Sequence, residues 1–171
     1  MIKIIDNALT QEEFKSIKQD ILDVPSDDWN EVGIVTKEDK ERQFVLKVYD
    51  EFQPTHSLFY KIFHTDNFLL CLQPKAIIRI KINRMLKTEE PFLPDYHFDI
   101  ADCMTAIFHL TTSNGKTVFK NGIEINGIEN RLIIFDSNLE HTGYTCTDKE
   151  ERIVMNINYF KRNPEEEQHV N

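Results

Sequence analysis

The sequence predicts a mainly β protein with N-terminal helices, in which about eight short strands close into a double-sheet β-barrel of the jelly-roll kind. Two observations carry this prediction. From Ala76 onward, apolar residues alternate with polar ones, whereas before this point they follow helical spacing. Turn signals then divide the chain at Ser113-Asn114-Gly115, Asn121-Gly122 and Asp136-Ser137-Asn138. Short strands separated by regular turns are typical of sandwiches and barrels.

Two helices are expected before the barrel. Thr10-Gln11-Glu12-Glu13 has the form of a capping box, and apolar residues follow it at helical spacing. A second helix is expected over roughly residues 56–70. Residues 25–40 are polar and carry few periodic signals, so they are expected to form a loop. We therefore expect residues 1–75 to form a helical support for the barrel.

The segment 76–160 carries the strand patterns. Ile78, Ile80 and Ile82 alternate with polar residues, as a strand with one buried face requires. Asn121-Gly122 lies between two apolar runs and indicates a two-residue hairpin turn. Residues 161–171 are acidic and are expected to be a frayed tail, so that 1–171 forms a single domain. Further strands are expected at roughly 96–100, 104–112, 116–120, 123–127, 131–136, 141–146 and 151–160.

Composition and charge narrow the classes of function. A chain of 171 residues with 40% apolar and 29% charged residues is typical of an ordinary globular domain with one core. The net charge of −9 argues against a nucleic-acid partner, because a phosphate backbone is bound mainly by neutralising it with Lys and Arg. No apolar stretch approaches the roughly 20 residues that cross a bilayer, so no membrane association is expected.

The cysteines and the first residues indicate a cellular compartment. Cys71, Cys103 and Cys146 are widely spaced and form no Cys-x-x-Cys motif, which favours reduced thiols in a cytoplasmic protein. The sequence starts without the basic region and apolar run of a signal peptide. We therefore expect a cytoplasmic location.

A candidate metal site begins at Tyr96-His97-Phe98-Asp99-Ile100. His97 and Asp99 lie two residues apart in an expected strand, so their side chains share one face, and Phe98 between them is expected to pack. Alone, the pair is equally consistent with two solvated residues at a strand end. His141 follows a turn, where the barrel rim would lie, and is preferred as a third ligand over the mid-strand His109. Two His and one carboxylate with open positions form the facial triad of non-haem Fe(II) oxygenases.

The last expected strand offers a site for an anionic co-substrate. Arg152 lies eleven residues beyond His141, and a guanidinium can hold a carboxylate through two parallel hydrogen bonds. Polar groups on one face and apolar groups on the other fit a strand that borders a polar cavity, which Asn83 would also line. Alternation along this strand gives a first face of Arg152, Val154, Asn156 and Asn158, and a second face of Ile153, Met155, Ile157 and Tyr159.

These residues resemble a known family. His97-Phe98-Asp99, His141 and Arg152 are similar to the His-x-Asp…His…Arg signature of Fe(II)- and 2-oxoglutarate-dependent dioxygenases. Residues 115–119, 131–136 and 152–157 resemble the surrounding strands in the prolyl-4-hydroxylase-like branch, of which short members occur in bacteria and their viruses. The resemblance covers residues 76–160. Asn83 departs from it, because many hydroxylases of this branch have a tyrosine there, against the co-substrate.

The resemblance implies a double-stranded β-helix (jelly roll, cupin-like) that holds Fe(II) through His97, Asp99 and His141. It also implies 2-oxoglutarate as co-substrate, with its far carboxylate on Arg152, O2 as oxidant and ascorbate as an optional reductant. The implied reaction is hydroxylation of an unactivated C–H bond, in a peptidyl proline or an amino-acid-like small molecule. Asn83 and Asn156 are further candidates for contact with the co-substrate.

Other interpretations stay open from the sequence. The chain could be a non-catalytic jelly-roll binding domain that has kept the fold and lost the chemistry. It could also be a jelly-roll metalloenzyme that does not use 2-oxoglutarate, in which case Arg152 has no assigned partner. Arg79, on the polar face of its strand, is a rival anchor for the co-substrate. A small molecule or a peptide is the expected substrate, and the oligomeric state is open.

Overall fold

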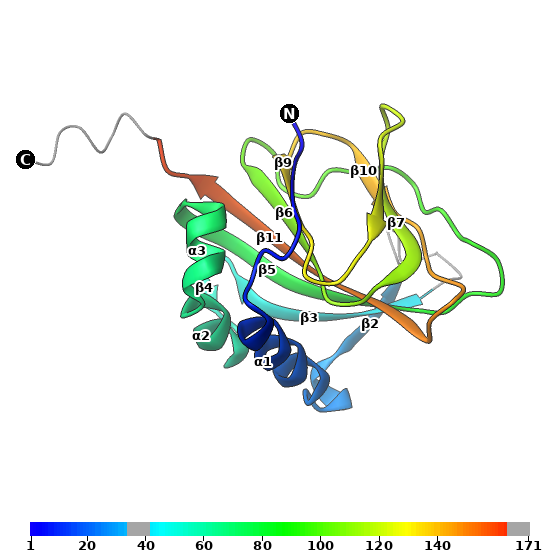
Figure 1. Ribbon diagram of the computed structural model, residues 1–171, viewed down its shortest axis with the longest axis horizontal. Helices are drawn as coiled ribbons and strands as arrows, with labels where there is room; N and C mark the ends of the chain where they lie inside the picture. Colours follow the sequence, from blue (N-terminus) through cyan, green and yellow to red (C-terminus); the bar gives the residue numbers. More distant parts are fainter. Residues whose placement is uncertain (34–41, 164–171) are drawn as a thin grey trace, which may run out of the picture.

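The computed structural model describes residues 1–33 and 42–163, which fold into two facing antiparallel sheets (Figure 1). The major sheet has eight strands in the order β1-β9-β6-β11-β5-β3-β2, with β4 paired to β3, and the minor sheet has the order β10-β7-β8. The major sheet contains β1 (Lys3–Ile5), β2 (Asn30–Gly33), β3 (Arg42–Asp50), β4 (Gln53–Pro54), β5 (Pro74–Leu86), β6 (Met104–His109), β9 (Leu132–Asp136) and β11 (Glu151–Lys161). The minor sheet contains β7 (Ser113–Phe119), β8 (Glu124–Gly127) and β10 (His141–Gly143).

The helices cover the face of the major sheet that points away from the minor sheet (Figure 1). They are α1 (Gln11–Leu22), the short 3-10 helix η1 (Ser26–Asp28), α2 (Leu58–Phe63) and α3 (Asp66–Leu72). The predicted capping box is present: Thr10 Oγ1 accepts from the Glu13 N–H at 3.2 Å, and Glu13 Oε2 accepts from the Thr10 N–H at 2.8 Å. The helix predicted over 56–70 is divided in two, because Thr65 is extended and begins α3.

Two cores lie on the two faces of the major sheet. The main core fills the space under the helices, where Phe108 of β6 packs edge-on against Phe14 and Phe68, with ring centroids 6.0 and 4.8 Å apart. As predicted, Ile153, Met155, Ile157 and Tyr159 of β11 point into this core. The smaller core lies between the sheets and contains Ile107, Phe119, Ile125, Ile133, Phe135 and Val154. It fills only part of the space between the sheets, and polar residues line the rest.

The N-terminal part is more than the helical support that we expected, because four strands come from it. β1 pairs with β9 and β3 pairs with β5, so residues before 76 extend the major sheet at both edges. The alternation of buried Leu46 and Val48 in β3 is a strand signal that the sequence analysis missed. The loop predicted over 25–40 contains η1 and β2, and its residues 34–40 lie outside the described residues, as do residues 164–171 of the predicted tail.

The hairpin between β7 and β8 differs from its prediction by one residue. The Phe119 N–H donates to the Ile123 carbonyl at 2.8 Å, so the loop is Lys120-Asn121-Gly122 and has three residues instead of two. Gly122 has φ of 89°, and a left-handed residue after a tight turn is typical of three-residue hairpin loops. The prediction of a hairpin at this place is confirmed.

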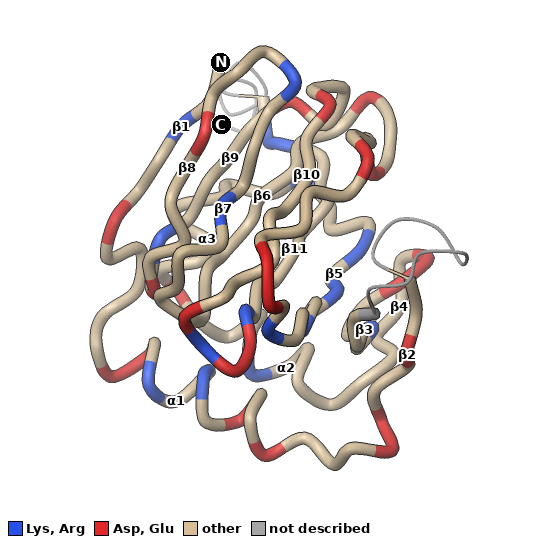
Figure 2. The backbone as a smooth tube through the Cα atoms, turned by 90° about the vertical axis from the view of Figure 1, so that its right-hand side faces the viewer, with Lys and Arg blue, Asp and Glu red and all other residues tan. Residues whose placement is uncertain are grey.

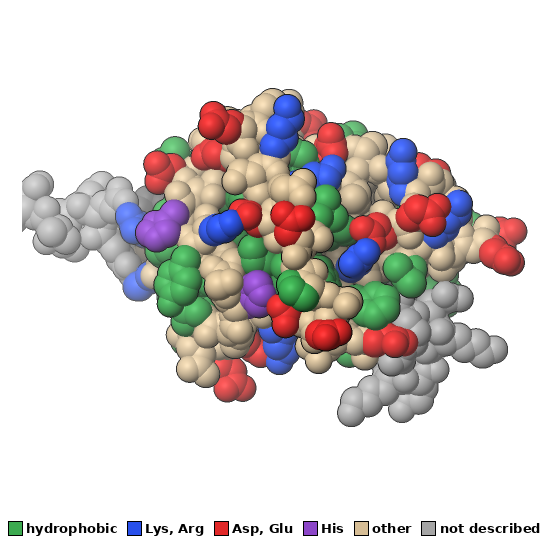
Figure 3. Space-filling view, turned by 90° about the horizontal axis from the view of Figure 1, so that it is seen from below, with side chains coloured by type: hydrophobic (Ala, Val, Ile, Leu, Met, Phe, Trp, Pro, Cys, Tyr) green, Lys and Arg blue, Asp and Glu red, His purple; other side chains and the backbone are tan. Residues whose placement is uncertain are grey.

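The surface carries mixed charges. Acidic and basic residues are spread along the described chain (Figure 2), and the face on which α1 and α2 lie mixes acidic, basic and apolar side chains (Figure 3). In the described part of the chain, no helix combines the length and the apolar character that a membrane span requires.

We expect Phe108→Ala to lower the free energy of unfolding by about 3–5 kcal/mol, because the fully buried ring joins α1 and α3 to the sheet. Urea-induced unfolding, followed by circular dichroism, measures this. Phe52→Ala is the control, since Phe52 is 60% exposed and should change the same quantity by less than about 1 kcal/mol. Equal losses in the two variants would contradict this account of the core.

Candidate active site

Polar side chains from both sheets converge on a small cavity of about 60 Å³. The major sheet contributes β3, β5, β6 and β11, and the minor sheet contributes β7 and β10. Five of the six predicted site residues line this cavity, namely Asn83, His97, His141, Arg152 and Asn156. The sixth, Asp99, is hydrogen-bonded to Asn156. The structure therefore brings together all of the residues that the sequence analysis selected.

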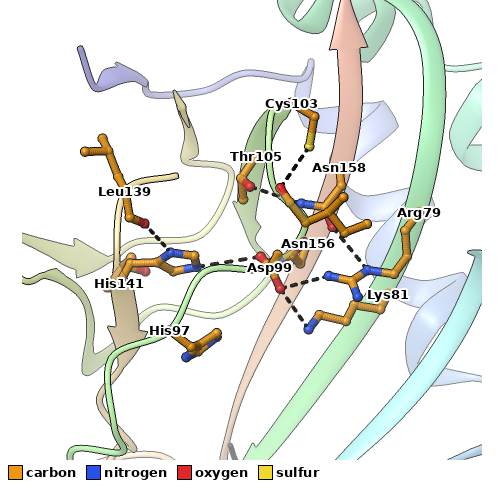
Figure 4. Close-up of polar contacts among 12 residues, drawn as sticks. Arg79, Lys81, His97, Asp99, Cys103, Thr105, Leu139, His141, Asn156 and Asn158 are labelled. Carbon is orange, nitrogen blue, oxygen red and sulfur yellow. Dashed lines mark hydrogen bonds and ion pairs between the residues drawn. The ribbon is translucent and has the colours of Figure 1, made fainter. Parts of the chain in front are cut away.

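Asp99 is the centre of a polar network (Figure 4). Its side chain is 2% exposed, and its Oδ1 accepts from Arg79 Nη2 at 2.8 Å and from Lys81 Nζ at 3.2 Å. Its Oδ2 accepts from Asn156 Nδ2 at 2.7 Å and lies 3.7 Å from His141 Nε2. Burial alone would raise the pKa of Asp99, but Lys81, Arg79 and the Asn156 hydrogen bond hold this pKa below its ordinary value. Asp99 is therefore an ionised carboxylate at neutral pH.

His141 presents a free ring nitrogen to Asp99. Its Nδ1 lies 3.0 Å from the carbonyl oxygen of Leu139, a contact that places the proton on Nδ1 and leaves the lone pair on Nε2. Burial lowers the pKa of His141 and outweighs the opposing effect of Asp99, so the imidazole is neutral. A neutral imidazole, oriented by a hydrogen bond from its other nitrogen, is the form that binds metal ions.

His97 lies opposite His141 through a β-bridge. The His97 N–H donates to the His141 carbonyl at 3.0 Å, the reverse bond is 2.9 Å long, and the ring centroids are 5.1 Å apart. The strand predicted over 96–100 is wrong, since only His97 pairs and the chain bends at Asp99. Asp99 reaches the site through this bend and its ionic contacts, not through strand alternation. Phe98 is 56% exposed, so the prediction that it packs is also wrong.

The three groups form a set with the chemistry of an Fe(II) site. Two imidazoles and one carboxylate are the ligands of the facial triad. Among residues 1–33 and 42–163, no three His, Cys, Asp or Glu side chains are close enough to hold a metal ion as they stand. Adjacent ligands about 2.1 Å from a metal are about 3 Å apart, and Asp99 Oδ2 lies 3.7 Å from His141 Nε2. The chemistry of the three donors fits Fe(II), and the Asp99–His141 pair is wider apart than two ligands of one metal.

Arg152 is a buried positive charge at the other end of the cavity. Its Nη2 donates to Thr117 Oγ1 at 3.2 Å, whereas its Nε has no hydrogen-bond partner and no described Asp or Glu forms an ion pair with it. Burial lowers the pKa of Arg152 to about 10, so it stays charged at neutral pH. A buried charge without a partner costs several kcal/mol. Such a group indicates a site for an anionic ligand.

Two glycines make room for this guanidinium. A Cβ atom at Gly115 would lie 2.6 Å from Arg152 Cδ, and one at Gly143 would lie 3.0 Å from Arg152 Nη1. Side chains at these positions would therefore push the guanidinium out of its place. Gly115 of the motif Gly115-Lys116-Thr117 therefore allows β7 to pack closely against Arg152, and Gly143 does the same for β10.

Several further polar atoms in the cavity lack partners. Asn83 Oδ1, Asn156 Oδ1 and Thr142 Oγ1 are buried without a hydrogen bond, a state that is rare unless a ligand or water completes it. Sequence reasoning missed Thr117 and Thr142, because threonines on strands form no motif. The signal that could have indicated Thr117 is the strand period of two, because Thr117 and Val118 are neighbours on β7 and point to opposite faces.

The remaining candidates are Arg79, Asn158 and His109. Arg79 donates to Asp99 and to Asn158, and it stands opposite Asn158 on the neighbouring strand, six residues from Arg152 along that strand. Asn158 also donates to Thr105 at 3.0 Å, so it is a satisfied buried residue. His109 is fully buried on β6, with neither ring nitrogen hydrogen-bonded, and burial holds its pKa well below the ordinary value. The structure does not bring His109 to Asp99.

Comparison with known proteins agrees with this fold. The sequence matches no protein-family model and no curated protein significantly. An oxidoreductase of the 2OG-Fe(II) oxygenase family from Burkholderia pseudomallei superposes with a TM-score of 0.73 and 17% identity, over 95% of this chain and 86% of that one. A prolyl hydroxylase from Trichoplax adhaerens, in complex with a hypoxia-inducible-factor peptide fragment, gives 0.67 and 13%, over 94% and 83%.

A third solved structure with this fold is that of an epimerase. The α-ketoglutarate-dependent non-haem epimerase SnoN of nogalamycin biosynthesis superposes with a TM-score of 0.69 and 9% identity, over 94% of this chain and 78% of that one. The predicted jelly-roll fold is confirmed, and it is the fold of 2OG-Fe(II) oxygenases, prolyl hydroxylases among them. At these identities the similarity concerns the fold, and the chemistry follows from the site.

We expect Arg152→Met to raise the free energy of unfolding of the ligand-free protein by about 1–4 kcal/mol, because it removes a buried, unpaired charge and keeps the side-chain volume. Urea-induced unfolding measures the change. Arg131→Met is the matched control, since Arg131 is paired with Asp6 and its loss should leave stability unchanged or lower it. A fall in stability for Arg152→Met would show that the native protein already satisfies this charge.

Proposed function

We propose that this protein is an Fe(II)- and 2-oxoglutarate-dependent oxygenase that hydroxylates an unactivated C–H bond of a small molecule or a peptide. The observation that carries the proposal is the buried, unpaired guanidinium of Arg152, which shares one small cavity with two imidazoles and lies on the strand that carries Asn156, the partner of Asp99. The fold supports it, because structures with the same fold include oxygenases of this kind.

In this proposal His97, Asp99 and His141 hold the iron. The Oδ2 atom of Asp99 faces the free Nε2 of His141, so it is the oxygen available to a metal. Arg79 and Lys81 hold the other oxygen, Oδ1, and thereby keep the carboxylate ionised and oriented. Leu139 sets the tautomer of His141 through its carbonyl oxygen.

Arg152 binds the far carboxylate of 2-oxoglutarate, with Thr117 beside it and with Asn83 and Asn156 as further polar contacts. When bound, Fe(II), 2-oxoglutarate and O2 supply the oxidising power for C–H hydroxylation and yield succinate and CO2. Met85, Ile107 and Val154 form the apolar part of the wall and limit the access of water to the cavity. The same buried charge argues against a metalloenzyme that does not use 2-oxoglutarate, because Arg152 would then have no partner.

A cytoplasmic location belongs to this proposal. Its support is the cysteine usage of the sequence, because Cys71, Cys103 and Cys146 are widely spaced and form no Cys-x-x-Cys motif.

Anaerobic addition of Fe(II) and 2-oxoglutarate should produce a weak visible charge-transfer band, because the co-substrate chelates the iron. His97→Ala should abolish the band, since it removes one of three protein ligands. His64→Ala is the matched control, because His64 is exposed at the end of α2 and should leave the band intact. Absence of the band in the wild type, together with no succinate formed in air with ascorbate present, would overturn the proposal and favour a non-catalytic binding domain.

Arg152→Met should weaken 2-oxoglutarate binding far more than metal binding. Losing one partner of a buried charge pair costs about 2–5 kcal/mol, so the Kd for 2-oxoglutarate should rise roughly 30-fold or more. The Kd for the metal should change by less than about threefold, because Arg152 does not contact Asp99 or either imidazole. Calorimetric titration with Co(II), followed by 2-oxoglutarate, gives both values. Equal loss of both affinities would contradict the role of Arg152.

A further inference from the structure

We propose that the primary substrate is a small molecule with an anionic group, and that Arg79 and Lys81 of β5 bind this group. The inference rests on the proposed function, because it concerns the same site. Its basis is an excess of positive charge on the cavity side of β5, next to the candidate metal ligand Asp99.

Basic residues recur along β5, as Figure 2 shows. Arg79 and Lys81 are two apart and both point toward Asp99, so they lie on the cavity face (Figure 4). Lys47 of β3 pairs in register with Lys81 and therefore projects from the same face. Like charges directly opposite each other destabilise a sheet. Asp99 and Asp50 offset this repulsion in part, and a further anion would offset more of it.

Asp99 compensates these cations only in part. One oxygen atom, Oδ1, accepts hydrogen bonds from both Arg79 and Lys81. Arg79 uses a second N–H on Asn158, and Lys47 pairs with Asp50. A guanidinium has five N–H donors and an ammonium has three, so both side chains keep donors for a ligand. They are 20% and 22% exposed, and hence open to a molecule that enters the site.

The charges of the loaded site do not balance without a further anion. Arg79, Lys81, Arg152 and a divalent metal carry five positive charges in all. Asp99 and the 2-oxoglutarate dianion supply three negative charges, so two positive charges remain. The residues described as lining the cavity add no Asp or Glu. In a protein with a net charge of −9, such a local surplus attracts small anions, whereas a nucleic acid is repelled by the rest of the surface.

The charge surplus favours some substrate classes over others. A carboxylate or a phosphate accepts hydrogen bonds from a guanidinium and an ammonium together. A free amino acid or another small acid has such a group, whereas a proline within a peptide chain does not. The alternative role for Arg79 and Lys81 is to orient Asp99 alone, and this role predicts no preference for a charged substrate.

The test compares two probes of nearly equal shape, N-acetyl-L-proline and its neutral amide, with the protein loaded with Co(II) and 2-oxoglutarate. Calorimetry should show that the acid binds about tenfold tighter than the amide or better, which is about 1.4 kcal/mol. Arg79→Gln and Lys81→Gln should each reduce this ratio to below about threefold. Lys18→Gln removes a surface charge that is paired with Glu129, and it should leave the ratio unchanged. Inorganic phosphate as a third probe separates the two anion types.

Several results would overturn the inference. These are equal binding of acid and amide, no binding of either anion, or a ratio that Arg79→Gln and Lys81→Gln do not change. Weaker Co(II) binding in both variants, read from the Co(II) absorbance, with an unchanged ratio would assign them to the orientation of Asp99. If the wild type binds neither Co(II) nor 2-oxoglutarate, the proposed function itself fails, and this outcome is distinct from loss of the charge preference.

Discussion

The antiparallel pairing of β5 with β11 positions both the main core and the candidate site. The two strands pair from Glu151 and Leu86 to Lys161 and Pro74, and the strand period of two then gives each of them one face toward the helices and one toward the cavity. Ile153 and Met155 therefore enter the core, while Arg152 and Asn156 enter the site. A slip of one residue would exchange these sets and place a guanidinium under the helices, so core packing and site geometry are specified together.

Charge organises the site where backbone pairing does not. Asp99 lies outside the strands, two residues from the His97–His141 bridge, and its carboxylate is held by cations and an amide from β5 and β11. This arrangement orients one oxygen toward His141 and leaves the other with Arg79 and Lys81. The position of a candidate metal ligand thus depends on electrostatic contacts that are strong because they are buried.

The ligand-free site contains several groups that lower the stability of the fold. Arg152 is charged, buried and unpaired, and polar atoms of Asn83, Asn156 and Thr142 lack partners beside it. The large core under the helices, with Phe108 at its centre, supplies the stability that offsets this cost. Such a site is expected where a ligand completes the polar contacts, because each unsatisfied group then gains a hydrogen bond on binding.

Much of this protein follows from local patterns. The capping box at Thr10, the alternation along β11 and the hairpin near Gly122 are readable in the sequence, because each depends on periodicity or on spacing between neighbours. The set His97, Asp99, His141 and Arg152 was selected by residue type and by its resemblance to a known signature. β1, β2, β3 and β4 were missed, and a strand was wrongly assigned around Asp99. β1 pairs with the distant β9, which no local pattern reveals, whereas β3 carries a local alternation that was overlooked.

Only the tertiary structure decided which charged groups lie next to one another. Three features depend on register between strands and on burial: Lys81 faces Asp99, Lys47 stands opposite Lys81, and Arg152 has no carboxylate beside it. A single strand has neither property, because both arise only when the sheets pack against each other. The sequence by itself therefore determined the candidate ligands, and the folded arrangement determined the electrostatic environment in which they act.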